Sequence, residues 1–578
     1  MKGLIGMAQR FPTVAVFGLG TTGCHLVDAL VRGGRRVIAV ERDEAALRRG
    51  RGRVTAAESA VEFTTDPAAA ARADLVIEAV PERLETKRRL LARAHADCPP
   101  ETVFATTTTG LPVTEIAFGS GRTDRTVGLH LFPLGPDRED RAVEVVGTPL
   151  TGDAVLADVR ELVRDLGRIP VPVADRPGFI GGALTMAYLN NAVAMYERRY
   201  ASRDSIDTAM TLGCGLPMGP LAQLDAMGLD TARDSLEALY ERTGDPRYAP
   251  APTLAHMVTA GLLGVKAGRG FYEYEAGGAA RGGEADGLGE PVPARAVRRI
   301  GVVGSGTMAV GIAEVCARSG YPTVLVARSG LRAKEATAAV ERSLERGVRR
   351  GKLAPGLLTE SMDRLTAGRD LQPLGTCDLV VEAVAEDIDV KRAVFADLDR
   401  VCAPGAVLAT STSSLPVIEC AMATRRPEDV IGMHFFNPAP VMRLVEVVHT
   451  VLTSKEARGT AHAVAAALGK RAVDCPDRAG FIVNALLFPY LNSAVAMVQE
   501  GWATAADIDT VMAAGQGYPM GPLRLLDVIG LDVSLAIQRT LHGTFRDPAL
   551  APARHLERLV EAGHLGRKGG RGLRLHEG

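Results

Sequence analysis

The stretch VAVFGLGTTG, residues 14–23, places a short β-branched and aromatic run directly before the spacing G-x-G-x-x-G. A closely similar stretch, IGVVGSGTMA, fills residues 300–309, with Ala309 in place of the last glycine. A helix-like stretch follows each copy. Such a turn lets the backbone approach a pyrophosphate and points the N-terminus of a helix at it. One copy alone would also fit an ordinary strand–helix turn, but the duplicate favours two Rossmann-type dinucleotide-binding sheets.

Three further pairs of stretches repeat at a constant offset of 302 residues. RPGFIGGALT (176–185) returns as RAGFIVNALL (478–487), and the segments 212–230 and 264–271 return at 514–532 and 566–573. A period of this length is far longer than a solenoid repeat, so the sequence predicts a duplicated two-domain protein. The first pair differs at one informative position, where Gly182 in the first half corresponds to Asn484 in the second.

Each half changes its pattern midway. Short β-branched runs alternate with helix-like stretches at first, which predicts an α/β parallel sheet, and successive amphipathic helices ended by Gly and Pro follow. A Gly/Ala/Pro-rich stretch between the halves predicts an exposed linker. The expected units are an α/β Rossmann-type domain over 13–172, an all-α helical domain over 173–275, a linker over 276–296, a second α/β domain over 297–473 and a second helical domain over 474–578.

Composition narrows the class of protein. Apolar residues make up 47% and charged residues 23% of the 578, and the net charge of −1 gives no reason to expect nucleic acid or an acidic membrane as partner. The eight cysteines show neither C-x-x-C nor a zinc-ligand spacing, so no metal site is expected. No apolar run is long enough for a membrane span, and MKGLIGMAQRFP is too short for a signal peptide. We expect a cytoplasmic protein.

The end of the second strand in each sheet predicts the type of nicotinamide cofactor. Glu41 can accept hydrogen bonds from an adenosine ribose, as NAD requires. The equivalent position in the second half is Ala327, followed by Arg328 and Ser329. A guanidinium there can pair with a ribose 2′-phosphate, although Arg328 also fits a plain surface arginine. The sequence therefore favours NADP(H) in the second half and NAD(H) in the first, bound also by the loop residues Gly18, Gly20, Gly23, Gly304, Gly306, Thr307 and Met308.

Four polar residues of the second half form a candidate catalytic set. His434 can take a proton from an alcohol while hydride leaves its carbon, and Glu446 can fix the tautomer of that imidazole. The hydroxyl of Ser413 and the amide of Asn484 can hold substrate oxygens. Taken singly, each has a plainer reading: His434 as a satisfied core histidine, for example, or Ser413 as a turn cap.

The sequence around these residues resembles the 3-hydroxyacyl-CoA dehydrogenase family, of the short-chain 3-hydroxybutyryl-CoA type. Both halves of the chain show this resemblance. The matching motifs are STSSLP, GMHFFNPAP, LVEVV, DRAGFIVNALLFPYLN, PMGP and GRKGGRG. The resemblance implies interconversion of 3-hydroxyacyl-CoA and 3-ketoacyl-CoA with a nicotinamide cofactor. It also implies specific roles: His434 as general base, Glu446 as its orienting partner, Ser413 on the substrate hydroxyl, Asn484 on the thioester end, Glu386 and Lys391 on the nicotinamide side, and the basic stretch 331–352 on the adenosine end of CoA.

The first half departs from this pattern. His130 and Glu144 remain, but 14 residues apart instead of 12, Thr109 replaces the serine and Gly182 the amide. The segment from the glycine loop to this threonine is also 18 residues shorter, at the place of the CoA-facing stretch. We therefore expect the active site in the second half and an internal pseudo-dimer through the helical domains.

Several alternatives stay open at this point. Both halves could be catalytically active, with the first acting on another substrate. The chain could instead be a dinucleotide-loaded acyl-CoA sensor without turnover. A 6-phosphogluconate-type dehydrogenase shares the broad architecture but would use a lysine in place of the His434–Glu446 pair.

Overall fold

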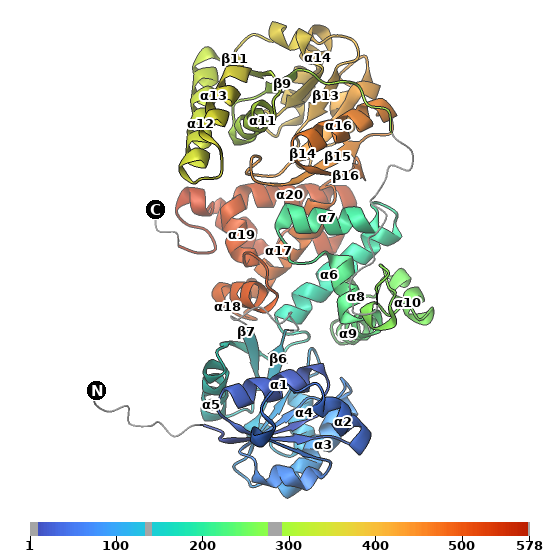
Figure 1. Ribbon diagram of the computed structural model, residues 1–578, viewed down its shortest axis with the longest axis vertical. Helices are drawn as coiled ribbons and strands as arrows, with labels where there is room; N and C mark the ends of the chain where they lie inside the picture. The colour runs from blue at the N-terminus through green and yellow to red at the C-terminus, as the bar shows by residue number, and fades with distance from the viewer. Residues whose placement is uncertain (1–9, 133–141, 276–291, 576–578) are drawn as a thin grey trace, which may run out of the picture.

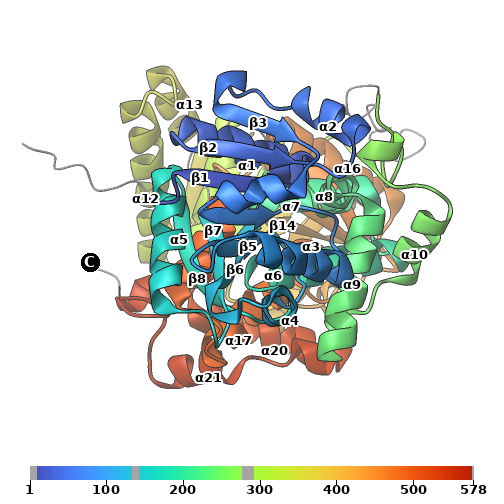
Figure 2. The ribbon, with the colours of Figure 1, turned by 90° about the horizontal axis from the view of Figure 1, so that it is seen from below.

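The computed structural model describes residues 10–132, 142–275 and 292–575. Two sheet domains lie at opposite ends of the long axis, and the helices of both halves lie between them (Figure 1). The view along that axis shows the first sheet domain stacked over the helices (Figure 2). The predicted fold class is confirmed, because each half is a mostly parallel sheet followed by a helical domain. Most of the expected linker, residues 276–291, lies outside the described residues.

The first sheet has the strand order β3-β2-β1-β4-β5-β6-β7-β8, and β7 runs antiparallel to β6. Its strands are β1 (Thr13–Phe17), β2 (Arg36–Val40), β3 (Val61–Thr64), β4 (Leu75–Glu78), β5 (Val103–Thr106), β6 (Thr126–Leu131), β7 (Ala142–Gly147) and β8 (Ile169–Ala174). Its helices are α1 (Thr21–Arg32), α2 (Glu44–Arg51), α3 (Leu84–Asp97), α4 (Val113–Ser120) and α5 (Asp153–Asp165).

The second sheet repeats this order as β11-β10-β9-β12-β13-β14-β15-β16, again with one antiparallel pair, β14 and β15. Its strands are β9 (Ile300–Val303), β10 (Thr323–Val326), β11 (Leu365–Gly368), β12 (Leu379–Glu382), β13 (Val407–Thr410), β14 (Val430–Phe435), β15 (Leu444–His449) and β16 (Arg471–Pro476). Its helices are α11 (Thr307–Arg318), α12 (Gly330–Arg349), α13 (Pro355–Arg364), α14 (Ile388–Val401), α15 (Val417–Ala421) and α16 (Lys455–Ala467).

The central strands are buried on both faces, which explains their nearly continuous apolar sequence. In β1, Val14 and Val16 pack with α1 and α5, whereas Ala15 and Phe17 face α3 and α4 on the other side. This two-residue alternation over an uninterrupted apolar run fixes the helices on both faces of the sheet.

The helical domains also correspond. The first contains α6 (Gly181–Glu197), α7 (Arg203–Cys214), α8 (Pro220–Met227), α9 (Leu229–Thr243) and α10 (Pro252–Thr259). The second contains α17 (Val483–Gln499), α18 (Ala505–Thr510) continued by a π-helical turn (Val511–Gly515), α19 (Pro522–Ile529), α20 (Leu531–Phe545) and α21 (Arg554–Glu561). No helix within the described ranges is long and apolar enough to cross a bilayer.

Residues of the two helical domains contact one another directly. Asn191 Nδ2 donates to Ala485 O at 3.2 Å, and Arg247 donates to the Ser493 hydroxyl at 2.7 Å. One continuous apolar core contains buried residues from both helical domains and reaches both sheets. The two halves therefore pack against each other through their helical domains.

Two cation–π contacts between the halves are reciprocal. The Arg176 guanidinium lies 5.2 Å from the Trp502 ring, and the Arg478 guanidinium lies 5.2 Å from the Tyr200 ring. The two arginines are equivalent positions of the repeat, and so are the two aromatic residues.

The sheet domains differ most after their second strands. The first half has the short helix α2 and a 3-10 turn (Glu58–Ala60) there, whereas the second has the long helix α12 and the additional helix α13. These two helices lie beside α11 at the β11 edge of the sheet (Figure 1). The 18-residue difference seen in the sequence is located at this place.

Candidate active site

The two glycine loops have the shape that a dinucleotide needs. Gly18 has a φ of +92°, and a β-carbon there would lie 2.7 Å from the Ala79 carbonyl oxygen, so only glycine fits without strain. A β-carbon on Gly20 or Gly306 would meet no heavy atom of the described structure within 4 Å. Both of these glycines immediately precede a helix, α1 or α11, and leave open space at its N-terminus. That space fits a pyrophosphate, which would accept hydrogen bonds from the helix N-terminus.

The residues expected to select the cofactor lie beside these loops. Glu41 accepts hydrogen bonds from the backbone N–H of Leu19 at 2.8 Å and of Arg42 at 2.9 Å, which fixes its carboxylate next to the first loop. In the second half Ala327 is buried, Arg328 is exposed, and Ser329 caps helix α12 by accepting from the Arg332 N–H at 3.2 Å.

The remaining loop residues begin helix α11. Thr307 is exposed at the helix N-terminus, while Met308 is partly buried against the apolar core of the second sheet. Thr307 is therefore accessible to a phosphate, and we expect Met308 to contact a nucleotide through its backbone.

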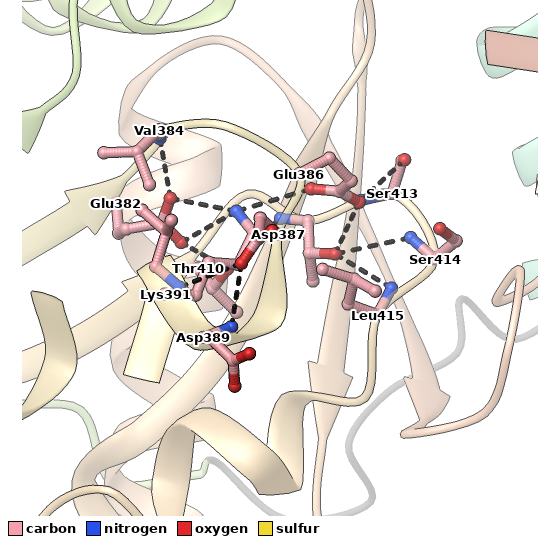
Figure 3. Close-up of polar contacts among 12 residues, drawn as sticks. Glu382, Val384, Glu386, Asp387, Asp389, Lys391, Thr410, Ser413, Ser414 and Leu415 are labelled. Carbon is pink, nitrogen blue, oxygen red and sulfur yellow. Dashed lines mark hydrogen bonds and ion pairs between the residues drawn. The ribbon is translucent and has the colours of Figure 1, made fainter. Parts of the chain in front are cut away.

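A buried ion-pair network supports the loop that carries Ser413 (Figure 3). Lys391, with 1% of its side chain exposed, donates to both oxygens of the fully buried Glu382 at 2.9 and 3.0 Å. Its Nζ also lies 3.4 Å from Glu386 Oε2. We therefore expect Lys391 to hold Glu386 in place, and a direct contact between Lys391 and a nucleotide stays a prediction.

Glu386 in turn organises the turn after β13. Its Oε1 accepts hydrogen bonds from the Thr412 hydroxyl at 2.7 Å, the Ser413 N–H at 2.8 Å and the Ser413 hydroxyl at 3.0 Å. Burial raises the pKa of Glu386, but the Lys391 charge and these hydrogen bonds outweigh it, so the pKa lies below its ordinary value. An ionised Glu386 therefore fixes the Ser413 hydroxyl close to the site.

His434 and Glu446 face each other across the antiparallel strands β14 and β15. His434 Nδ1 lies 2.6 Å from Glu446 Oε2, and Glu446 Oε1 accepts from the Ile482 and Val483 N–H groups at 2.9 Å each. The fully buried carboxylate is thus held on both oxygens, which a buried charge requires. Since Nδ1 is engaged, Nε2 is the ring nitrogen left for proton transfer with a substrate.

Asn484 joins this pair to the Ser413 loop. It is the second residue of helix α17, directly after the two residues whose amides hold Glu446, and its Nδ2 donates to the Ser413 carbonyl oxygen at 3.0 Å. The four residues of the expected catalytic set therefore meet at one place, between the second sheet and the second helical domain. Their specific roles stay predictions.

The first half keeps most of this arrangement. His130 pairs with Glu144 in the same register, and Glu144 Oε1 accepts from the amides of Ile180 and Gly181. The two extra residues between His130 and Glu144 therefore leave the pair intact; residues 133–141 of this connection lie outside the described residues.

The supporting network is preserved in the first half as well. Thr109 donates through its N–H and its hydroxyl to Glu82, at 2.9 and 3.2 Å, and Lys87 pairs with the buried Glu78 at 2.9 Å. The amide is what is missing. Gly182 has no side chain to bond the Thr109 carbonyl, although a β-carbon there would lie 3.1 Å from that oxygen.

Sequence reasoning missed part of this site. It did not identify Glu382, whose carboxylate also accepts from the Thr410 hydroxyl at 2.7 Å, nor the backbone amides that hold Glu446. A signal was present for the first, because a single glutamate inside the apolar strands LVVE and LVIE demands a buried partner. The backbone amides that hold Glu446 could not be identified from the sequence, because almost every residue type has a backbone N–H.

Comparison with known proteins agrees with this geometry. The profile for the 3-hydroxyacyl-CoA dehydrogenase NAD-binding domain matches residues 13–176 and 299–478, and the profile for the C-terminal domain of the same family matches 178–274 and 480–575. These matches cover most of the chain. The protein therefore belongs to the 3-hydroxyacyl-CoA dehydrogenase family, with both family domains present twice.

Two sequence relatives each correspond to about half of the chain, whereas one solved structure covers nearly all of it. A 3-hydroxybutyryl-CoA dehydrogenase from Mycobacterium tuberculosis is 46% identical over 280 residues, which are 48% of this chain and 98% of the relative. Human mitochondrial hydroxyacyl-coenzyme A dehydrogenase is 39% identical over 285 residues, 48% of this chain and 90% of that protein. A crystal structure of 3-hydroxybutyryl-CoA dehydrogenase from Escherichia coli K12 covers 96% of this chain and 99% of its own, with a TM-score of 0.65 and 24% identity, and so shares the fold.

Proposed function

We propose that the second half interconverts short-chain 3-hydroxyacyl-CoA and 3-ketoacyl-CoA, of the 3-hydroxybutyryl-CoA and acetoacetyl-CoA type. The observation that carries this proposal is the bond from Asn484 to the Ser413 loop, which brings an amide beside the His434–Glu446 pair. Gly182 leaves the first half without that amide. The named substrates of the relatives support the short acyl chain.

A bound nicotinamide ring would accept or donate the hydride at C3 of the substrate. For oxidation, His434 Nε2 removes the proton of the 3-hydroxyl group, and the Glu446 carboxylate stabilises the imidazolium that forms. The Ser413 hydroxyl has one proton, which it donates to Glu386 at 3.0 Å, and by turning that proton away from Glu386 it can donate to the same substrate oxygen. Asn484 can hold the thioester end with the amide hydrogen that the Ser413 carbonyl does not use.

A steady-state assay of the full-length protein tests this proposal directly. The reaction is reduction of acetoacetyl-CoA, followed by the loss of NADH or NADPH absorbance in separate experiments. Turnover supports a dehydrogenase, whereas binding of acetoacetyl-CoA with a nucleotide but without turnover would support the sensor. Cytoplasmic location remains part of the proposal.

For the first half we propose a structural role as the partner in an internal pseudo-dimer. The hydrogen bond from α6 to α17, the bond from Arg247 to Ser493 and the reciprocal cation–π contacts support this. The intact His130–Glu144 pair favours a second candidate, in which the first half turns over another substrate. Nucleotide binding to the first half, with or without turnover of another acyl-CoA that His130→Ala abolishes, distinguishes these candidates.

Asn484→Ala is expected to weaken acyl-CoA binding specifically. Loss of one polar contact costs about 1–3 kcal/mol, so kcat/KM for acetoacetyl-CoA should fall by about 5- to 150-fold, mainly through KM. The KM for the nicotinamide nucleotide should change less than about twofold. Gly182→Ala is the matched control in the first half and should leave both constants near their original values. An unchanged KM for acetoacetyl-CoA in Asn484→Ala would remove Asn484 from substrate binding.

The second half is expected to prefer NADPH. Ala327 offers no carboxylate to a ribose 2′-hydroxyl, and the exposed Arg328 offers a charge where a 2′-phosphate would project. A charge-assisted hydrogen bond contributes about 1.5–3 kcal/mol, or one to two orders of magnitude in affinity. Ala327→Asp combined with Arg328→Leu should therefore shift kcat/KM toward NADH. A wild-type preference for NADH would contradict the assignment and leave Arg328 as a surface charge.

A further inference from the structure

Helix α7 of the first half lies against the catalytic strands of the second half. In Figure 1 it runs directly below β15 and β16, and it also contacts the second-half helix α17. Tyr200, just before α7, donates from its hydroxyl to the Pro476 carbonyl oxygen at 3.1 Å and so ties the start of this segment to the end of β16. The first half therefore forms one wall next to the second site.

One close approach is at Gly213, near the C-terminal end of α7. A β-carbon on this glycine would lie 2.8 Å from Leu444 Cδ2, 3.1 Å from Val483 Cγ2 and 3.6 Å from Phe436 Cε1. All three neighbours belong to the second half, and the first distance is shorter than carbon atoms tolerate. An alanine at this position would have to displace Leu444, which is fully buried.

Each of these three neighbours lies close to the catalytic pair in the structure or along its strand. Leu444 lies two residues before Glu446 on β15, so both side chains are on the same face of the strand. The Val483 N–H donates to Glu446 Oε1 at 2.9 Å. The Phe436 ring lies 4.5 Å from the His434 imidazole, centroid to centroid. A displacement at Gly213 would thus reach both members of the pair.

The local helix does not itself require glycine at position 213. Alanine is the better helix former, and Gly213 is not among the residues with positive φ. The left-handed residue that ends α7 is Gly215, with a φ of +69°. Packing against the second half is therefore the physical reason for a residue without a side chain at 213.

We propose that Gly213 is a positioning residue for the His434–Glu446 pair, supplied by the opposite half of the chain. The first half then completes the active site of the second, in addition to any role in association. This inference rests on the proposed function, because it concerns turnover at His434.

The repeat supplies a matched control. Gly515, the equivalent of Gly213 and the last residue of the π-helical turn, packs on Phe132 of the first half, with a β-carbon 2.7 Å from Cδ2 of that ring. The Phe132 ring lies 4.6 Å from the His130 imidazole. Gly515→Ala therefore introduces the same methyl group at the equivalent position, but against the ring beside the other histidine.

The experiment compares Gly213→Ala and Gly515→Ala in the full-length chain. For acetoacetyl-CoA reduction, Gly213→Ala should lower kcat by about 10- to 100-fold, because small shifts of catalytic groups have effects of this size. The KM for the nucleotide should stay within about twofold. Gly515→Ala should keep kcat within about twofold, while both variants lower the melting temperature to a similar extent.

A compensating change separates positioning from general destabilisation. Leu444→Val removes the δ-carbon nearest to the new methyl group, so Gly213→Ala/Leu444→Val should recover at least tenfold of the lost kcat, a coupling that a double-mutant cycle measures. Equal losses of kcat in Gly213→Ala and Gly515→Ala, or no recovery in the double variant, would overturn the proposal. An active His434→Ala variant would instead overturn the proposed function itself, so the two failures are distinguishable.

Discussion

Replacement of His434 by alanine is expected to lower kcat for acetoacetyl-CoA reduction by about two to four orders of magnitude. This is the usual contribution of a general acid–base, and here the group that would donate the proton in reduction is lost. The Glu446 carboxylate would keep the two backbone hydrogen bonds from Ile482 and Val483, so the fold around the site should persist. Stopped-flow or steady-state loss of NADPH absorbance measures the effect.

His130→Ala is the matched control, because His130 has the same partner geometry in the first half. This substitution should leave kcat for acetoacetyl-CoA reduction within a few-fold of the value for the unsubstituted protein. Two other results are distinguishable from this one. A crippling effect of His130→Ala alone would move the active site to the first half. If His130→Ala and His434→Ala each lowered kcat by about half, and only the double variant had no activity, both halves would turn over the same substrate.

The largest expected effect on stability comes from Lys391→Met. The substitution leaves the fully buried Glu382 without its ion-pair partner, and such a change typically costs 3–5 kcal/mol. Urea unfolding, monitored by circular dichroism, should show this loss of stability as a transition at a lower urea concentration. Lys87→Met, at the equivalent pair with Glu78, should have a similar effect on the first half.

Neutralising the stranded carboxylate provides the control for this prediction. In Glu382→Gln the amide oxygen can still accept from the Val384 N–H, and the amide NH2 can donate to the Thr410 hydroxyl, which now donates to the other carboxylate oxygen. The double variant Lys391→Met/Glu382→Gln should therefore be more stable than Lys391→Met alone. A loss below about 1 kcal/mol in Lys391→Met would contradict the importance of this pair.

The local part of the architecture could be predicted from the sequence because local rules govern it. The glycine loops follow from the steric demand at Gly18, and the strands follow from continuous apolar runs buried on both faces. The meeting of His434 with Glu446 also follows from chain order, because the 12-residue spacing fits two antiparallel strands and their connection. The two extra residues between His130 and Glu144 leave the pair intact, since an insertion in a connection need not change strand register.

The contacts between the halves could not be read in this way. Gly213 looks like any helical glycine in the sequence, and its neighbours Leu444 and Val483 lie more than 200 residues away. Neither periodicity nor spacing relates such positions. Likewise, the amides that hold Glu446 depend on where helix α17 begins relative to β15, which is a tertiary relationship.

The reciprocal contacts between the halves have a further consequence for divergence. Arg176 faces a tryptophan, whereas the equivalent Arg478 faces a tyrosine. In a symmetric homodimer one codon specifies both surfaces, so every substitution occurs twice and must fit its own copy. Within a single polypeptide each surface can drift alone, and dilution cannot lower the effective concentration of the partner. Glycine at position 182 together with asparagine at the equivalent position 484 is a difference that a fused chain permits and that two identical shorter chains cannot have.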